Sequence, residues 1–391
     1  MKSSRISWVS RVVMALLCAA SCISSTPAQR NPSGMPQPRL YQVNPPGAKA
    51  GSTLEVVIAG FHLEEPERLV FGDPGIKAEF LPPPAPEIDP KTKKPKPVAN
   101  ALPADHFKFR VTVPPTAKLG NHYVRVVSKW GVSNPRVFVV GDLPEMAEKE
   151  PNNEVDQANK VELNTTINGT LGSPTDVDYF AVAVKKGQRV VVSCQSGSID
   201  GRALPQIEIY DAKDRQLASN CSYSGTDAVA DFIASEDGTY TVRLIQFTHI
   251  FRAAVSGGLP GGASDHFYRL SISTRPWIDS VHPAVVEAGK TTMVTVLGRN
   301  LPGGQIEPTA TVDESTLEKI TMPITVPPEA RGKLNFSGYV PPNMGWEDGL
   351  ELRVKNASGS SNPFLVGLAR VPLLTDNDKN DTPELAQEIP L

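Results

Sequence analysis

Hydrophobic and polar side chains alternate along several short segments of the chain. Leu54, Val56 and Ile58 are spaced two residues apart, and the same spacing recurs at 107–111 (FKFRV) and 124–126 (VRV). Successive side chains of a β-strand point to opposite faces, so this period is typical of strands with one face buried. Turns that contain glycine bound these segments. The pattern therefore predicts short strands of a β-sandwich.

The chain also contains an internal repeat. Residues 43–63 (VNPPGAKAGSTLEVVIAGFHL) align without a gap to residues 281–301 (VHPAVVEAGKTTMVTVLGRNL). Further on, Ser133-Asn134-Pro135 recurs as Ser361-Asn362-Pro363. The second copy is shorter between these two matches, where the first copy has the proline-rich, charged stretch 81–105. We expect this stretch to be an exposed insertion.

Each copy has a proline, then a glycine, then an alternating strand that ends in Gly-x-x-Leu. In this pattern, residues 36–143 and 276–374 resemble immunoglobulin-like IPT/TIG domains. The resemblance implies one β-sandwich for each copy. A generic immunoglobulin-like sandwich is the alternative.

A different unit, at 148–275, lies between the two copies. Strand-like runs alternate there with polar turns. Four short motifs follow one another along it: Glu150-Pro151-Asn152-Asn153, Asp178-Tyr179-Phe180, Tyr210-Asp211 and Gly238-Thr239-Tyr240. With these motifs in this order, the unit closely resembles the bacterial pre-peptidase C-terminal domain. That family is a β-sandwich appended to secreted peptidases and is related to the collagen-binding domains of clostridial collagenases. The stretch 248–264 departs from the family's compact form, and we expect a loop there.

The last residues repeat the start of the middle unit. The residues that match at a constant offset are Glu148, Glu150, Asn152, Asn153, Ala158 and Leu163 with Asp376, Asp378, Asn380, Asp381, Ala386 and Leu391. We therefore interpret 375–391 as the start of a second, truncated copy, and we expect the chain to be a fragment of a longer repeat protein.

Composition agrees with this reading. The 391 residues include 37 prolines and 30 glycines, and only 6% are aromatic. This mix suits many short strands joined by turns and argues against long helices. We predict an all-β chain of tandem β-sandwiches. The formal net charge of -3 gives no sign of a surface for nucleic acid.

The N-terminus has the features of an export signal. Lys2, Arg5 and Arg11 form a positively charged start, and an apolar run follows at 12–23. The run is shorter than the roughly 20 residues that a transmembrane helix needs. We predict a signal peptide at 1–28 and no transmembrane segment.

The mature chain is then expected to be secreted, periplasmic or held at the cell surface. Cys22 follows Ala19-Ala20-Ser21, which weakly matches a bacterial lipoprotein signal. A lipid anchor at Cys22 is therefore the alternative to a soluble chain.

Catalytic signatures are absent from the sequence. There is no GxSxG, HExxH, Walker A or dinucleotide-binding motif. No two histidines are spaced to share one helix face around a metal. We predict that the chain is not an enzyme.

A cluster of carboxylates and amides opens the middle unit. Its members are Glu148, Glu150, Asn152, Asn153, Asp176 and Asp178. Calcium takes about six to eight oxygen ligands, which carboxylates and amide carbonyls can supply. In the collagen-binding domains that this unit resembles, the acidic linker residues and the aspartate pair meet around calcium. The resemblance therefore implies a structural calcium site here. A solvated linker that only makes a turn is the alternative, but the repeat keeps an oxygen-bearing side chain at every linker position of the cluster.

Cys194 and Cys221 are the cysteines that follow the signal peptide. An exported chain with an even number of cysteines permits a disulfide, and we predict a bridge between these two. A buried thiol together with an unrelated turn thiol is the alternative.

Two functions remain open at this point. In the first, the chain is a non-catalytic secreted or surface module that binds an extracellular polymer or protein surface, with calcium as its structural cofactor. In the second, it is the accessory region of a secreted peptidase whose catalytic domain lies outside this chain. The sequence favours the first because sandwich units account for every segment.

Overall fold

The computed structural model describes residues 35–83, 91, 106–173, 175–247, 265–330, 336–340, 348–369, 371–374, 376 and 379–389. The predicted signal peptide with Cys22, the expected loop at 248–264 and most of the insertion at 81–105 lie outside these residues. Asp378 and Leu391 of the C-terminal repeat also lie outside them.

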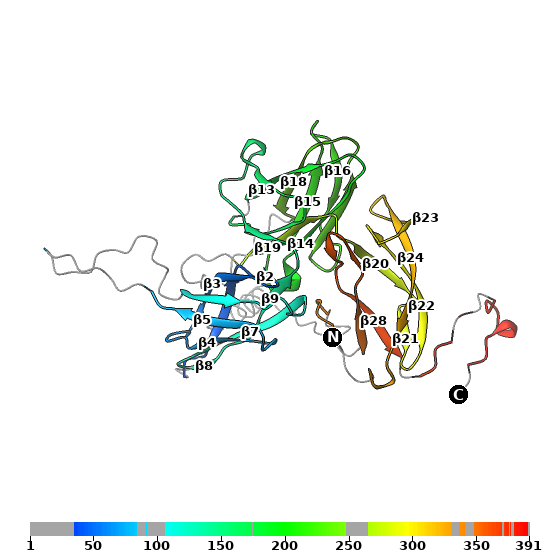
Figure 1. The fold of residues 1–391 in the computed structure, drawn as a ribbon, viewed down its shortest axis with the longest axis horizontal. Helices are drawn as coiled ribbons and strands as arrows, with labels where there is room; N and C mark the ends of the chain where they lie inside the picture. The colour runs from blue at the N-terminus through cyan, green and yellow to red at the C-terminus, as the bar shows by residue number, and fades with distance from the viewer. Residues whose placement is uncertain are drawn as a thin grey trace, which may run out of the picture. The chain divides into compact units, whose positions relative to one another are not determined.

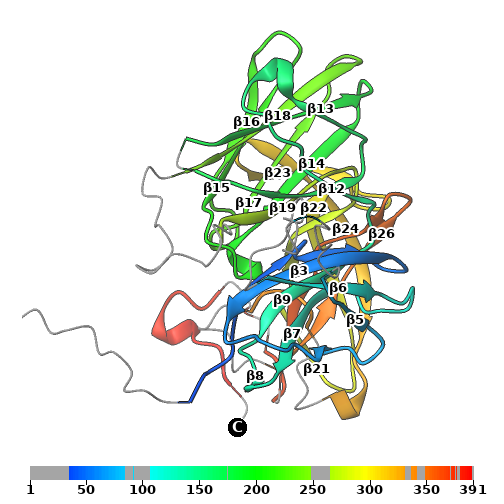
Figure 2. The same cartoon turned by 90° about the vertical axis from the view of Figure 1, so that its left-hand side faces the viewer.

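The described chain is built of β-strands, with short 3-10 turns and no α-helix among its residues (Figures 1 and 2). The predicted all-β fold of tandem sandwiches is confirmed. None of the described helical segments is long and apolar enough to cross a membrane.

The first sandwich consists of two sheets that enclose one apolar core. Its first sheet has the order β1 (Arg39–Asn44), β3 (Thr53–Phe61), β6 (His106–Thr112) and β5 (Lys77–Leu81). Its second sheet has the order β2 (Gly47–Lys49), β9 (Arg136–Gly141), β7 (Gly120–Ser128) and β4 (Arg68–Phe71), with β8 (Gly131–Val132) paired to β7. Figure 2 shows β3, β6 and β5 beside one another. Val56, Ile58, Phe109 and Val111 are fully buried in the core, as their alternation predicts.

The third sandwich repeats this arrangement. One sheet has the order β20 (Trp277–His282), β22 (Thr291–Arg299), β24 (Ser315–Thr325) and β23 (Gln305–Val312). The facing strands are β21 (Val285–Glu287), β28 (Phe364–Ala369) and β25 (Gly349–Leu352), and a small hairpin joins β26 (Lys355–Asn356) to β27 (Gly359–Ser360). In both sandwiches a short second strand runs parallel to the last one, β2 with β9 and β21 with β28.

The repeated Ser-Asn-Pro tripeptide has the same structural role in both sandwiches. Asn134 accepts a hydrogen bond from Leu40 N at 2.8 Å and donates one to Leu40 O at 2.9 Å. Asn362 makes the equivalent pair with Ile278, at 2.7 and 3.0 Å. A side-chain amide can satisfy one backbone donor and one backbone acceptor together. The tripeptide therefore fastens the first strand of each sandwich to the segment before its last strand.

The repeated glycine near the end of β3 and β22 is required by close packing. A Cβ atom at Gly60 would lie 1.9 Å from Arg39 O, and one at Gly298 would lie 2.1 Å from Trp277 O. Both distances are far below van der Waals contact. Only glycine therefore lets the first strand of each sandwich pass this close to the next.

The middle sandwich has two sheets of five strands each. One has the order β10 (Glu145–Ala147), β12 (Thr165–Thr170), β19 (Phe267–Ser273), β14 (Arg189–Gln195) and β17 (Ala228–Ile233). The other has the order β11 (Asn159–Val161), β13 (Val177–Val184), β18 (Gly238–Gln246), β15 (Pro205–Tyr210) and β16 (Gln216–Asn220). Figure 1 shows β13, β18, β15 and β16 side by side. The 3-10 turns among the described residues of the whole chain are η1 (Val155–Gln157), η2 (Gly197–Ile199), η4 (Pro328–Ala330) and η6 (Pro383–Leu385).

The predicted Cys194–Cys221 bridge is not present in the structure, where both residues are free cysteines. Cys194 lies in β14 and is 1% exposed within the core between the two sheets. Burial raises the pKa of its thiol well above the usual value. Cys221 follows the edge strand β16 and is partly exposed. The core encloses Cys194, whereas Cys221 lies just beyond the end of β16 in the other sheet.

A buried group of charged side chains connects the middle and third sandwiches. Asp231 of β17 accepts hydrogen bonds from Arg189 Nε at 2.7 Å and from Arg299 Nε at 2.6 Å. Ser315 Oγ donates a third at 2.9 Å. Arg299 also pairs with Asp279 of β20. Removing one partner from a buried ion pair costs about 3–5 kcal/mol, so these contacts favour one defined arrangement of β17 against β22.

Candidate metal centre

The linker that opens the middle sandwich crosses from one of its sheets to the other. Strand β10 ends at Ala147 in the first sheet, and β11 begins at Asn159 in the second. Asn159 fixes the crossing segment, because its side chain accepts from Lys149 N at 2.7 Å and donates to Lys149 O at 2.8 Å. The predicted linker residues are thereby held beside the start of β13, which carries Asp178.

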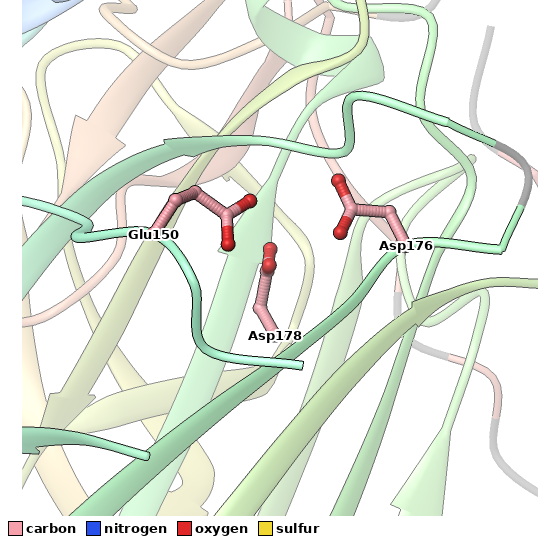
Figure 3. A group of neighbouring side chains, drawn as sticks. All are labelled: Glu150, Asp176 and Asp178. Carbon is pink, nitrogen blue, oxygen red and sulfur yellow. The ribbon is translucent and has the colours of Figure 1, made fainter. Parts of the chain in front are cut away.

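Three of the predicted carboxylates meet at this point. Glu150 of the linker, Asp176 just before β13 and Asp178 within β13 each place an oxygen within 4.8 Å of the others (Figure 3). Figure 3 shows their carboxylate groups facing one another. Asp178 is fully buried, whereas Glu150 is exposed. The cluster thus lies at the boundary between the core and solvent.

Asn152 completes one side of this group. Its side chain is fully buried, and one of its amide atoms lies 2.7 Å from Glu150 Oε2 and 3.3 Å from Asp178 Oδ1. With the amide nitrogen in this position, Asn152 donates hydrogen bonds to both carboxylates. With the amide oxygen there, three oxygens converge, and that orientation is favourable only around a cation.

Glu148 lies next to the group and is bonded to the sandwich rather than to the three carboxylates. Its Oε1 accepts from Thr170 N at 2.6 Å, and its Oε2 accepts from Tyr268 Oη at 2.7 Å. The same Tyr268 hydroxyl lies 2.6 Å from Asp178 Oδ2. A phenol has one proton and can donate to only one of the two carboxylates. The second contact is therefore a hydrogen bond only when one carboxyl group is protonated.

Asn153 and Asp176 bond to the backbone around the site. Asn153 Oδ1 accepts from Val177 N at 3.1 Å, and Asp176 Oδ2 accepts from Gly172 N at 2.5 Å. The first bond ties the linker to the start of β13. Asn153 thus has a structural partner, while Asp176 has one oxygen bonded and still belongs to the carboxylate group.

The electrostatics of the group disfavour several negative charges together. Burial, and then the neighbouring Glu148, raises the pKa of Asp178 to about 8. Burial also raises the pKa of Glu148 to about 7, and the charges of Glu150 and Asp176 contribute to the rise. Among the residues that the structure describes, no lysine or arginine pairs with these carboxylates. The group therefore lacks a cation to balance its charge.

The donor set fits calcium. All of the converging side chains offer oxygen, and none offers the nitrogen or sulfur that zinc favours. Calcium accepts carboxylates and amide carbonyls in a flexible geometry, whereas magnesium demands a near-ideal octahedron. Glu150, Asn152, Asp176 and Asp178 are the residues that would hold the ion, and Glu148 and Asn153 would support them.

Tyr268 is the residue of this site that sequence reasoning missed. Gly169 is coupled to it, because a Cβ atom there would lie 2.3 Å from Tyr268 Oη and 2.4 Å from Glu148 Oε2. Position 169 must therefore be glycine for the tyrosine to reach Glu148. The available signal was that a buried tyrosine needs a partner for its hydroxyl group.

No protein-family model matches the chain, and no curated protein matches it. Among solved structures, the chain is similar to the pre-peptidase C-terminal domain of a collagenase from Bacillus anthracis, with 20% identity and a TM-score of 0.23. That alignment covers 34% of this chain and 99% of the other. The family is the one that residues 148–275 resemble in sequence.

Two further similar structures are both called SGBP-B. The first, from the mixed-linkage glucan utilization locus of Bacteroides ovatus, was solved with a mixed-linkage heptasaccharide. It is 11% identical, with a TM-score of 0.20, and the alignment covers 60% of this chain and 52% of that protein. The second, from a xyloglucan utilization locus of Bacteroides uniformis, is 9% identical, with a TM-score of 0.19 and coverage of 61% and 72%. Likeness at this level has no bearing on what this chain binds.

Proposed function

We propose that this chain is a non-catalytic binding protein that acts outside the cytoplasm, and that calcium stabilises its middle sandwich. The observation that carries the calcium proposal is the convergence of Glu150, Asp176 and Asp178, with the Asn152 amide beside them and no cationic partner among the described residues. A bound calcium ion would balance these charges and join the linker to β13.

The proposed location suits such a site. Extracellular modules bind calcium with dissociation constants of about 10⁻⁴–10⁻³ M. The charged and apolar pattern of residues 1–28 supports export. In an exported chain, a site of this kind is a structural clamp rather than a signalling switch.

The binding role rests on the tandem arrangement. Three sandwiches, each with its own core, present several surfaces on one chain. Linked weak sites can exceed their individual affinities by about 10²–10⁴ when geometry allows them to engage together. The partner that suits this arrangement is an extended extracellular polymer with many equivalent positions.

Thermal unfolding of the mature chain tests the calcium proposal. We expect calcium, at a hundred times its dissociation constant, to stabilise the protein by about 2.7 kcal/mol relative to a chelator, because only the folded state binds it. The double variant Asp176→Ala, Asp178→Ala should lose this effect. The matched control, Asp376→Ala with Asp381→Ala in the C-terminal repeat, should keep it. A melting curve of the unmutated chain that calcium does not move contradicts the proposal.

The absence of catalysis has its own test. The purified mature chain is expected to cleave neither peptide nor glycosidic bonds. Hydrolysis that a single substitution within the chain abolishes would show that the chain is an enzyme.

A further inference from the structure

A cavity of about 520 Å³ lies where residues of all three sandwiches meet. Its walls include residues of β7 and β9, of β14 and β19, and of β20 together with residues 336–339. Small-molecule sites usually measure about 300–1,000 Å³, so the cavity is large enough for a ligand of one or a few rings.

Polar atoms in these walls have no partner. Trp277 Nε1 and Asp279 Oδ2 are buried and make no hydrogen bond within the described part of the chain. The Asp279 side chain is only 3% exposed, and its other oxygen already accepts from Tyr223 and Arg299. Trp277 and Asp279 both line the cavity from β20, which bulges between Ile278 and Ser280. The cavity thus offers a donor and an acceptor that a ligand or ordered water must satisfy.

The three arginines that line the cavity each pair with an acidic side chain. Arg269 pairs with Glu145 at 2.7 Å, and Arg275 pairs with Asp142 at 3.2 Å. Arg353 pairs with Glu351 at 2.6 Å. Each of these arginines has an acidic partner, although Arg269 Nε itself makes no hydrogen bond with the described residues. The pairing disfavours an anionic ligand, and the unpaired donors and acceptor suit a neutral ligand that both donates and accepts hydrogen bonds.

Aromatic rings supply the remaining surface. Tyr223 and Trp277 pack edge to face, with ring centroids 6.1 Å apart, and Phe336 also lines the cavity. Tyr339 lines it as well and is 47% exposed. A sugar ring matches this combination, because its hydroxyl groups donate and accept while its C–H faces pack on aromatic rings. The buried contact of Asp231 with Arg299 holds β17 against β22, which favours a preformed cavity.

We propose that this cavity binds the end of a neutral oligosaccharide. The inference rests on the proposed function of the chain as an extracellular binding protein, and it names the class of ligand. Trp277 Nε1 donates to a sugar hydroxyl and Asp279 Oδ2 accepts from a neighbouring one. Tyr339 packs on the ring from the more exposed side of the cavity.

Calorimetric titration of the mature chain tests the proposal, with cellotetraose, xylotetraose, maltotetraose and N,N′,N″,N‴-tetraacetylchitotetraose as probes. We expect at least one of them to bind. Trp277→Phe keeps an aromatic ring and removes the N–H, and it should weaken binding about 3- to 10-fold. Tyr339→Ala should weaken it to a similar degree. The matched control is Trp130→Phe, because Trp130 is exposed and its Nε1 already donates to Glu64 at 3.0 Å.

Two results would overturn the proposal. If none of the four probes binds at millimolar concentration, ordered water satisfies the unpaired atoms. If a probe binds equally well to Trp277→Phe and Tyr339→Ala, the sugar occupies another surface. The melting curves of both variants in calcium and in chelator show whether they fold. They also separate failure of this inference from failure of the proposed function, because the calcium response does not involve the cavity.

Discussion

The end of the linker at 154–158 and its repeat at 382–386 have nearly the same local backbone. In each, an extended residue precedes a short 3-10 turn, η1 in the first copy and η6 in the second. The extended residue has φ −129° and ψ 155° at Glu154, and φ −130° and ψ 156° at Thr382. This shape recurs without the same tertiary surroundings, so short-range sequence is enough to set it.

The side chains of the two copies differ far more. Asn152 is fully buried against the middle sandwich, whereas its counterpart Asn380 is exposed, as are Asp376 and Asp381. Carboxylates that remain in water keep their charges at little cost, whereas Asp178 is buried among other carboxylates. The comparison shows that the local sequence determines the turn. The metal centre, in contrast, depends on residues that the two sheets place beside the linker.

Asp178→Asn should have the largest effect, and its sign should depend on calcium. With calcium, the variant loses a ligand, and we expect it to lose most of the stabilisation of about 2.7 kcal/mol that saturating metal provides. In chelator at pH 7, the folded chain must take up a proton at Asp178, whose pKa is about 8 there, and asparagine removes this cost, so the variant should be more stable than the unmutated chain. Chemical unfolding under the two conditions measures both effects. If the variant is less stable than the unmutated chain in chelator, the buried carboxyl group of Asp178 does not destabilise the metal-free protein.

Tyr268→Phe should have the next largest effect. It removes the hydroxyl group that contacts both Glu148 and Asp178 and leaves the ring in the core. Hydrogen bonds to charged groups contribute about 1.5–3 kcal/mol, so we expect a loss of about 2 kcal/mol in chelator. Tyr240→Phe is a suitable control, because the Tyr240 hydroxyl donates only to the backbone oxygen of Glu236, at 3.0 Å. If both variants lose the same amount of stability, the contacts of Tyr268 with the carboxylates contribute no more than an ordinary hydrogen bond to the backbone.

The sequence predicted the members of the carboxylate group but not all of their roles. Glu150, Asp176 and Asp178 converge, whereas the oxygens of Glu148 bond to Thr170 and Tyr268. The partner of each carboxylate oxygen depends on contacts between strands that are distant in sequence. A buried tyrosine signals only that its hydroxyl group needs a partner, and the sequence does not show that Tyr268 points to this site, because all the residues of β19 are buried and no alternation gives the direction of a side chain.

The fold was easier to predict where one face of a strand is exposed. In β7 the buried Val124 and Val126 flank the exposed Arg125, so the alternation gives the orientation directly. Cys194 lies in β14, where every residue except the last is buried. Its direction into the core could not be read from its neighbours, and the structure has both Cys194 and Cys221 as free cysteines.

The effect of pH should be smaller per pH unit, and calcium should remove or reverse it. The folded pKa of Asp178 is raised to about 8 from the model-peptide value of 3.8, so the folded state holds a proton that the unfolded state releases between these values. Stability in chelator should therefore fall as pH rises through this window, by at most about 1.4 kcal/mol per pH unit. Calcium displaces the proton and should remove or reverse the slope. Unfolding at pH 5 and pH 8, with Asp178→Asn as control, measures this difference. If the stability of Asp178→Asn in chelator falls with pH at the same slope, groups other than Asp178 cause the effect.

The smallest effect is expected in the second copy of the linker. Asp381 is the counterpart of Asn153 and is exposed, and Asp376 is exposed as well. Replacing both by Asn removes two charges from water, and substitutions at such surface positions usually change stability by less than about 0.5 kcal/mol. We expect no change in the calcium response, because Glu150, Asp176 and Asp178 are untouched. Isothermal titration with calcium should give the same stoichiometry before and after the change. A loss of one bound calcium per chain would show that the second copy binds metal with its local turn alone, and the dependence of the site on the surrounding sheets would then be disproved.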